Sequence, residues 1–233
     1  MNNENYKPLP ELIPQDIIDR ASKLGTAQLS DGMNGTGIFR NGCMDASMMP
    51  VDPSMRVVGT ACTVSTEDGD NFPIHVAIYQ GKPGYVLVVD GKGYTERAYM
   101  GDLMIGAAKA IGINGVVIDG YVRVKEGLRE LGLPVYSKGF MQRSPDKKGP
   151  GKINTPVVCA GVQVNPGDLV VGDYDGVAVV PREHILDVLE KAEKKAGYEQ
   201  KRQETIEAYA KCRQEGKELP DIAPLWVTEM LNK

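Results

Sequence analysis

The chain has 233 residues, of which 42% are hydrophobic and 25% charged, with 27 Gly and 15 Pro. This is an ordinary globular composition, and it excludes a coiled coil, a collagen-like repeat and a disordered polar chain. The length allows one large domain or two small ones. With 31 acidic against 27 basic residues, the net charge is −4, so neither nucleic acid nor an anionic membrane surface is an expected partner.

No stretch approaches the ~18 apolar residues that a membrane helix needs. Residues 1–16 contain no apolar signal core, so we expect a cytoplasmic protein. The four Cys residues are scattered without a CxxC pair, which predicts reduced and mostly buried thiols. With only two His residues, a zinc site is not expected. Any metal would be Mg²⁺ or Mn²⁺, held by carboxylates and water.

The first part of the chain predicts an arm, a helix, a loop and a strand. Residues 1–13 are polar and interrupted by Pro, and residues 14–24 repeat apolar side chains at helical spacing. Residues 40–55 are rich in Gly, Met and Pro, which is typical of a loop, and residues 56–66 have the pattern of a strand. We therefore separate an N-terminal arm and helix, residues 1–24, from the rest of the chain.

The middle of the chain predicts alternating strands and helices. Short apolar runs predict buried strands at 85–91, 115–120 and 133–139. Helical patterns lie between them at 101–112 and 123–132. This order indicates βαβ units, a parallel sheet and the α/β fold class.

The pattern changes after a polar loop at 140–153. Short strands within 156–181 are separated by Asn-Pro-Gly and Asp-Tyr-Asp-Gly turns, which indicates an antiparallel meander. Residues 182–218 are highly charged and carry an apolar seam, which predicts a long amphipathic helix. We therefore predict a core domain over 25–181, followed by a C-terminal helix and tail over 182–233.

The unit from Asp90 to Arg123 carries the candidate chemistry. A helix of ~11 residues descends ~16 Å, and the strand at 115–119 climbs back by ~17 Å, so Arg123 should return to the helix N-terminus at 101–104. Ligands of such sheets lie beyond the carboxyl ends of the strands. Free N–H groups at a helix start and a guanidinium both suit a carboxylate. We predict a small anionic substrate such as a keto acid.

Each of these residues also has a purely structural interpretation. An Asp at a helix start, such as Asp102, is often only a cap, and an Arg after a strand, such as Arg123, is often a surface residue. Asp90 and Asp119 each precede Gly at a strand end, which is typical of turns. His75 lies in an apolar-patterned segment, which favours a packing or capping role. Neither a nucleophile triad nor a P-loop motif is present.

Three runs of the sequence together resemble the RraA-like family. They are RVVGTACTV (56–64), GDLMIGAAKAIGINGVVIDGYVR (101–123) and PVVCAGVQVNPGDLVVGDYDGVAVVP (156–181). The family includes 4-hydroxy-4-methyl-2-oxoglutarate and 4-carboxy-4-hydroxy-2-oxoadipate aldolases and a regulator of ribonuclease E. The resemblance spans roughly residues 25–210. It implies a β/β/α swivelling-type sandwich, assembled as homotrimers or homohexamers with sites between subunits.

The resemblance also implies a class II pyruvate aldolase that uses Mg²⁺ or Mn²⁺. The aldolase signature is Asp, twenty residues, then Arg-Asp, and Asp102 and Arg123 match it at that spacing. The family holds the pyruvyl carboxylate on backbone amides at the helix start. The substrate-binding residues that this implies are Gly101, Asp102, Leu103, Met104 and Arg123. Glu199 falls where aldolases place an acidic residue that reaches a neighbouring subunit's site.

One position departs from the aldolase pattern. Val124 stands where aldolases have their metal-binding Asp, and valine has no ligand atom. The resemblance then leaves Asp102, together with Glu199 from a neighbouring subunit, to hold a hydrated ion through water, with Glu126 one turn along.

Three functional hypotheses remain open. The first is a metal-dependent lyase on a short hydroxy-2-oxo acid, with Asp102 and Arg123 catalytic, which would also decarboxylate oxaloacetate. The second, which Val124 favours, is a non-catalytic RraA-type regulator that binds another protein. The third is another enzyme on the same scaffold that acts on a small hydroxy or sugar acid.

Overall fold

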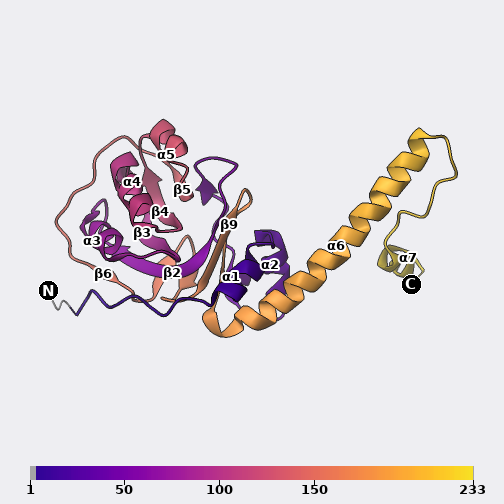
Figure 1. Cartoon of the computed structure of the whole chain (residues 1–233), viewed down its shortest axis with the longest axis horizontal. Coiled ribbons are helices and arrows are strands. Elements are labelled where there is room, and N and C mark those ends of the chain that lie inside the picture. Colours follow the sequence, from indigo (N-terminus) through magenta and orange to yellow (C-terminus); the bar gives the residue numbers. More distant parts are fainter. Residues whose placement is uncertain (1–3, 233) are drawn as a thin grey trace. The chain divides into compact units, whose positions relative to one another are not determined.

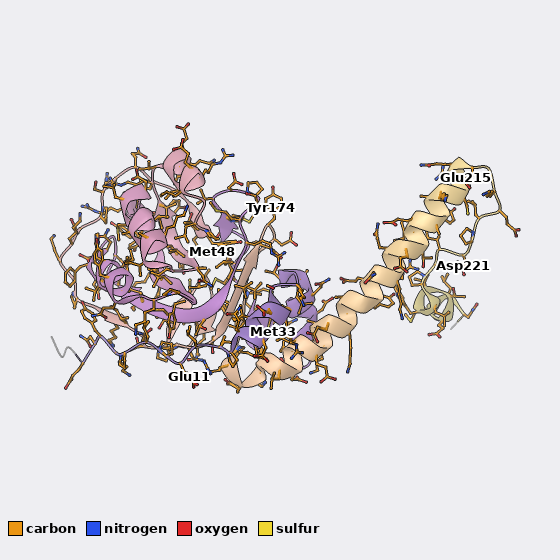
Figure 2. All side chains as sticks on the ribbon, viewed as in Figure 1. Glu11, Met33, Met48, Tyr174, Glu215 and Asp221 are labelled. Carbon is orange, nitrogen blue, oxygen red and sulfur yellow. The ribbon has the colours of Figure 1, made fainter. Side chains whose placement is uncertain are left out.

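The computed structural model describes residues 4–232 (Figure 1). The chain divides into two compact units, Met1–Ala192 and Glu193–Lys233. The first unit contains the whole sheet and the helices that pack on it, and the second contains the end of one long helix and a short terminal helix. In the first unit Met48 is fully buried while Tyr174 is 60% exposed (Figure 2).

Residues 4–232 form an eight-stranded mixed sheet of order β1-β5-β4-β3-β2-β9-β10, with β6 paired to β2. The central strands run parallel to one another: β2 (Val57–Thr66), β3 (Tyr85–Met100), β4 (Gly115–Val122) and β5 (Val135–Phe140). The others pair antiparallel with their neighbours: β1 (Met49–Pro50), β6 (Gly151–Ile153), β9 (Leu169–Asp173) and β10 (Gly176–Val180). A separate hairpin joins β7 (Val157–Cys159) to β8 (Val162–Val164). The predicted parallel core and antiparallel meander are confirmed.

Three helices cover one face of the sheet: α3 (Phe72–Gln80), α4 (Asp102–Ile111) and α5 (Lys125–Leu131) (Figure 1). Successive side chains of a strand point to opposite faces. Leu87 and Val89 therefore join the core beneath these helices, whereas Val86 and Val88 join the core beneath the β7–β8 hairpin. Both faces of the central strands are buried, which explains their nearly continuous apolar sequences.

Shorter elements close the ends of the first unit. They are α1 (Gln15–Ala21), α2 (Thr26–Gly32) and the 3₁₀ turns η1 (Phe39–Gly42) and η2 (Arg182–His184). The start of α2 is fixed by the Asp173 carboxylate, which accepts hydrogen bonds from the Thr26 backbone N–H (2.8 Å) and hydroxyl (2.7 Å).

The predicted long C-terminal helix is α6 (Ile185–Gln214), and it is followed by α7 (Leu225–Leu231). The apolar seam of its first turns is buried in the first unit, through Ile185, Val188, Leu189 and Ala192. In the second unit, Arg202 Nη2 donates to the Ile222 carbonyl at 2.8 Å, which ties the segment before α7 to α6. No helix within residues 4–232 is long and apolar enough to cross a membrane.

The prediction of turn residues is wrong for Asp119 and is supported for Asp90. The Lys92 N–H donates to Asp90 Oδ1 at 3.1 Å, and Lys92 and Gly93 have positive φ where the pairing of β3 is interrupted. β3 continues from Tyr85 to Met100 through irregular pairing, and Asp119 lies inside β4. The glycines that follow these acids also serve packing. A Cβ on Gly91 would lie 2.7 Å from the Tyr99 ring, and one on Gly120 would lie 2.6 Å from it. Each Asp-Gly pair therefore makes room for an aromatic ring within the sheet.

Candidate functional site

The helix start at α4 presents free backbone amides. Gly101 is the extended N-cap residue (φ −140°), and Asp102 is the first helical residue rather than the cap. The first intrahelical bond runs from the Ile105 N–H to the Gly101 carbonyl at 3.0 Å. The N–H groups of residues 102–104 precede that bond, and they point out of the positive end of the helix dipole. This end of α4 is suited to an anion.

Arg123 lies directly beside that helix start. It follows β4, and its backbone N–H donates to the Met100 carbonyl at 3.0 Å. A Cβ on Gly101 would lie 3.2 Å from Arg123 Cγ and 3.4 Å from its Nε, so glycine permits the close approach of the arginine to the backbone. Arg123 Nη1 donates to Ser144 Oγ at 2.6 Å. The structure therefore brings together the two elements that the βαβ geometry predicts to meet.

These groups line a hollow of about 190 Å³. All five predicted substrate-binding residues contribute to it, although their binding roles stay predictions. The full lining is Asn71, His75, Tyr99, Met100, Gly101, Asp102, Leu103, Met104, Arg123, Pro145 and Lys147.

Two polar lining residues, Asn71 and Lys147, were missed by the sequence reasoning, and a third, His75, was given only a packing or capping role. Asn71 and His75 belong to the start of α3, because the segment interpreted only as apolar-patterned is this helix. Burial lowers the pKa of His75, and the nearby Lys147 ammonium lowers it further. The imidazole therefore stays neutral at neutral pH. The Asn-Phe-Pro sequence at 71–73 was the available signal, since Pro is favoured in the first helical turn.

A buried carboxylate fixes the loop that carries Lys147. Asp70 is 4% exposed, and its Oδ1 accepts from the Phe72 N–H at 2.9 Å. Its Oδ2 accepts from the Gly149 N–H at 3.2 Å, so one side chain holds both the start of α3 and the loop. The Asn71 N–H adds a bond to the Asp146 carbonyl at 3.0 Å. The loop is thereby held as a wall of the hollow.

Val124 adopts a conformation that is unusual for its side chain. It is the N-cap of α5 with φ 61° and ψ 55°, and it is 47% exposed. A β-branched residue in the left-handed region is strained. A Cβ on Gly127 would lie 3.2 Å from Val124 Cγ1 and 3.5 Å from Asp102 Oδ2. Val124 Cγ1 and the Asp102 carboxylate therefore both lie close to Gly127.

Glu126, the other nearby acid of the sequence prediction, does not join Asp102. Across residues 4–232 there is no cluster of three His, Cys, Asp or Glu residues that could hold a metal ion. Of the described residues that line the hollow, Asp102 is the single acidic one. Glu126 lines a different depression, with Asp52 and Arg129. These residues do not fit a divalent ion that several protein groups coordinate directly.

Glu199 belongs to α6 in the second unit, where its carboxylate lies 3.9 Å from Lys195 Nζ. Its reach into a neighbouring subunit's site stays a prediction.

A second polar cluster lies on the opposite face of the same strands. Lys138 Nζ lies 2.6 Å from Asp119 Oδ1, and the other carboxylate oxygen accepts from the Ala160 N–H at 2.7 Å. Burial raises the pKa of the neighbouring Asp90, and the Asp119 charge raises it further. The hydrogen bond and ion pair of Asp119 tie the hairpin to the sheet, which indicates a structural role.

The sequence profile of the family described as RraA-like, Aldolase/RraA, matches residues 26–179. The chain belongs to the RraA-like family. A relative from Halalkalibacterium halodurans, provisionally named as a 4-hydroxy-4-methyl-2-oxoglutarate aldolase, is 38% identical over 191 residues, which cover 82% of this chain and 89% of the relative.

Solved structures share the fold of this chain. An uncharacterized protein from Pseudomonas syringae pv. tomato superposes with a TM-score of 0.72 at 28% identity, covering 91% of this chain and 97% of that one. Streptomyces coelicolor RraAS2, described as an unusual member of the RNase ES inhibitor RraA family, also gives 0.72, at 25% identity over 83% of this chain and 97% of its own. The RraA-like resemblance and the mixed α/β fold are thereby confirmed.

Proposed function

We propose that this RraA-like protein is a carbon–carbon lyase that cleaves a short hydroxy-2-oxo acid and releases pyruvate. One observation carries the proposal: the amides at the start of α4 and the Arg123 side chain line the same hollow. A helix start binds a carboxylate, and a guanidinium stabilises a developing oxyanion. The aldolase name of the Halalkalibacterium halodurans relative supports the same reaction class.

Each of these groups has a stated role in the proposed reaction. The substrate carboxylate binds the amides of Leu103 and Met104, and Arg123 donates to the 2-oxo oxygen. A water oriented by Asp102 takes the proton of the C4 hydroxyl. The C3–C4 bond then breaks, C4 becomes a carbonyl, and the electron pair forms the pyruvate enolate, whose negative oxygen Arg123 stabilises. Protonation of C3 gives pyruvate. Oxaloacetate would lose CO₂ to the same enolate.

No step of this mechanism passes through a metal, because Asp102 is the single carboxylate at the hollow among the described residues. A hydrated Mg²⁺ or Mn²⁺ held through Asp102 is the proposed cofactor, and calorimetry tests it directly. Val124→Asp would place a second carboxylate beside that of Asp102, so it should bind either ion more tightly than the wild type does. If the variant gains no affinity, residue 124 does not face the cofactor position.

The assay measures pyruvate released from 4-hydroxy-4-methyl-2-oxoglutarate and from oxaloacetate, with Mg²⁺, with Mn²⁺ and with EDTA. We expect release from at least one substrate, and its loss in Arg123→Ala. Arg129→Ala is the matched control, because Arg129 pairs with Asp52 at 2.8 Å on the outer side of α5. Absence of release under all metal conditions would falsify the lyase proposal.

A regulatory function is the alternative that Val124 favours, since it removes a ligand atom from the position of the aldolase metal site. A non-catalytic member would inhibit an RNase E-type ribonuclease without turning over oxo acids. Ribonuclease assays with the purified protein test this alternative. A ligand that binds without metal or turnover would instead favour the third hypothesis, an enzyme for another hydroxy or sugar acid.

Under each of the three functional hypotheses we propose that the protein is a homotrimer or a homohexamer. Light scattering measures this oligomeric state.

A further inference from the structure

We infer that Asn71 selects ligands that carry a hydroxyl group, by accepting a hydrogen bond from that hydroxyl at its Oδ1 atom. The inference deepens the proposed function and rests on it, because the hydroxyl in question is that of the hydroxy-2-oxo acid. Asn71 is then a specificity-determining residue at the side of the hollow formed by α3.

The orientation of the Asn71 amide is fixed by its surroundings. The side chain lines the hollow, and the residue is 2% exposed. Its Nδ2 donates to the Tyr99 carbonyl at 2.8 Å and lies 3.1 Å from Met104 Sδ. A carbonyl oxygen only accepts, so the amide cannot turn its own oxygen toward Tyr99. Oδ1 must therefore be the atom left for another partner.

The groups that hold the amide are themselves held. The Tyr99 side chain is fully buried, and its hydroxyl donates to the Gly91 carbonyl at 2.8 Å. The same hydroxyl accepts from the Gly69 N–H at 3.2 Å. Asn71 is thus bonded to a residue that belongs to a connected buried network. The amide is preorganised, so a ligand would not need to reorder it.

Asn71 Oδ1 has no hydrogen-bond partner in the described part of the chain. A buried acceptor without a donor is costly, and such atoms are rare in folded proteins. Although Asn71 is the N-cap of α3, its side chain makes no capping bond. The helix therefore does not explain the orientation of this oxygen.

Asn154 is an instructive comparison within the same chain. It is also buried, its Oδ1 also lacks a partner among residues 4–232, and its Nδ2 donates to the carbonyls of Lys7 and Pro8. Asn154 ties down the N-terminal arm and is absent from the lining of the hollow. The two asparagines differ in that Asn71 belongs to the lining of the hollow and Asn154 does not.

The chemistry of Oδ1 determines the kind of ligand group. An amide oxygen accepts, so it favours a hydroxyl and disfavours a carboxylate. The helix start at α4 and Arg123 already suit the acid end of the ligand. A hydroxyl farther along the ligand is then the donor that Asn71 lacks. This hydrogen bond belongs to the bound ligand before cleavage, and the hydroxyl proton leaves Oδ1 for the water at Asp102 when the C3–C4 bond breaks. A site built to bind a hydroxyl rejects the analogue without it, because its own polar group is left unpaired.

The test compares two ligands that differ only in that hydroxyl, 4-hydroxy-2-oxoglutarate and 2-oxoglutarate. Calorimetry on the full chain in EDTA measures binding, and the pyruvate released during the titration is quantified in parallel. We expect the wild type to prefer the hydroxylated ligand by about tenfold or more. Asn71→Ala should reduce the ratio to about one while keeping affinity for 2-oxoglutarate. Asn154→Ala, the matched control, should keep the wild-type ratio.

A second measurement needs no variant. The side-chain amide NMR signals of Asn71 should shift on titration with the hydroxylated ligand and much less with 2-oxoglutarate. A wild-type ratio near one, an unchanged ratio in Asn71→Ala, or no binding of either ligand overturns the inference. The two proposals fail separately: a clear preference without pyruvate release contradicts the lyase alone, and pyruvate release without a preference contradicts the role of Asn71 alone.

Discussion

Two polar groups of side chains lie near the carboxyl half of β4, at Asp119 and at Arg123, and they differ in how far other protein groups compensate them. Asp119 Oδ1 lies 2.6 Å from the Lys138 ammonium, an ion pair without hydrogen-bond geometry, and Oδ2 accepts from the Ala160 amide. Beyond the end of the same strand, Arg123 faces the free amides of α4, and Asn71 presents an oxygen that no described residue pairs. The satisfied cluster holds the fold together, whereas the open one has capacity for a ligand.

The largest expected effect on stability concerns the satisfied cluster around Asp119. Lys138→Met leaves the Asp119 carboxylate, whose side chain is only 9% exposed, without its counter-charge. We expect a loss of about 3 kcal/mol in the free energy of unfolding, as for other broken buried pairs. Urea denaturation measures it. Lys92→Met is the control, because Lys92 pairs with Glu67 at the surface and should cost about 0–1 kcal/mol.

The double variant Asp119→Asn/Lys138→Met sharpens the interpretation of that result. Removing both charges should recover much of the lost stability, because no uncompensated charge then stays buried. If the double variant is as unstable as Lys138→Met, the ion pair is not what holds the hairpin to the sheet.

The opposite pattern is expected for Arg123→Ala. Catalysis should fall by about 10²–10³-fold, the usual effect of removing one donor to an oxyanion. Stability should change little, because Arg123 is half-buried and its side-chain bond is to the exposed Ser144. Pyruvate release and a parallel melting curve check both halves. If Arg123→Ala is inactive because it no longer melts cooperatively, Arg123→Lys is measured in its place, since it keeps a positive charge at this position.

The sequence predicted the part of the site that comes from one continuous segment, residues 101–123. The helix start at 101 and its distance from Arg123 follow from the lengths of one helix and one strand, and both are found. The Asp119-Gly120 pair was misinterpreted because Gly120 accommodates Tyr99, a contact between strands that no local pattern reveals. Asn71 and Lys147 were missed because Asp70 joins two segments of the chain through a hydrogen bond that spans 79 residues.

A smaller effect is expected at Val124, on the rim of the open cluster. Val124→Asn should raise the free energy of unfolding by about 1 kcal/mol, because asparagine tolerates the left-handed backbone that strains valine. Val158→Asn is the control: Val158 is 56% exposed and lies in a strand, so the same change there should be slightly destabilising. Thermal melts of both variants give the comparison. Destabilisation at both positions would show that the strain at Val124 is not relieved by asparagine.

The smallest expected effect is the contribution of His75 to the pH dependence of stability. His75 is half-buried and lines the hollow. Burial and Lys147 lower its pKa in the folded state, so at mildly acidic pH the unfolded chain binds more protons than the folded one. Stability from this group is therefore complete above the unfolded pKa of about 6.5 and declines as the pH falls toward the folded value. The slope should be a fraction of the ~1.4 kcal/mol per pH unit of one full proton, because solvent screens a half-buried group. Urea denaturation between about pH 5 and 8, the range in which histidine titrates, should show a shallower slope in His75→Gln than in the wild type. Equal slopes in the two proteins would mean that neither burial nor the Lys147 charge lowers the pKa of the imidazole in solution.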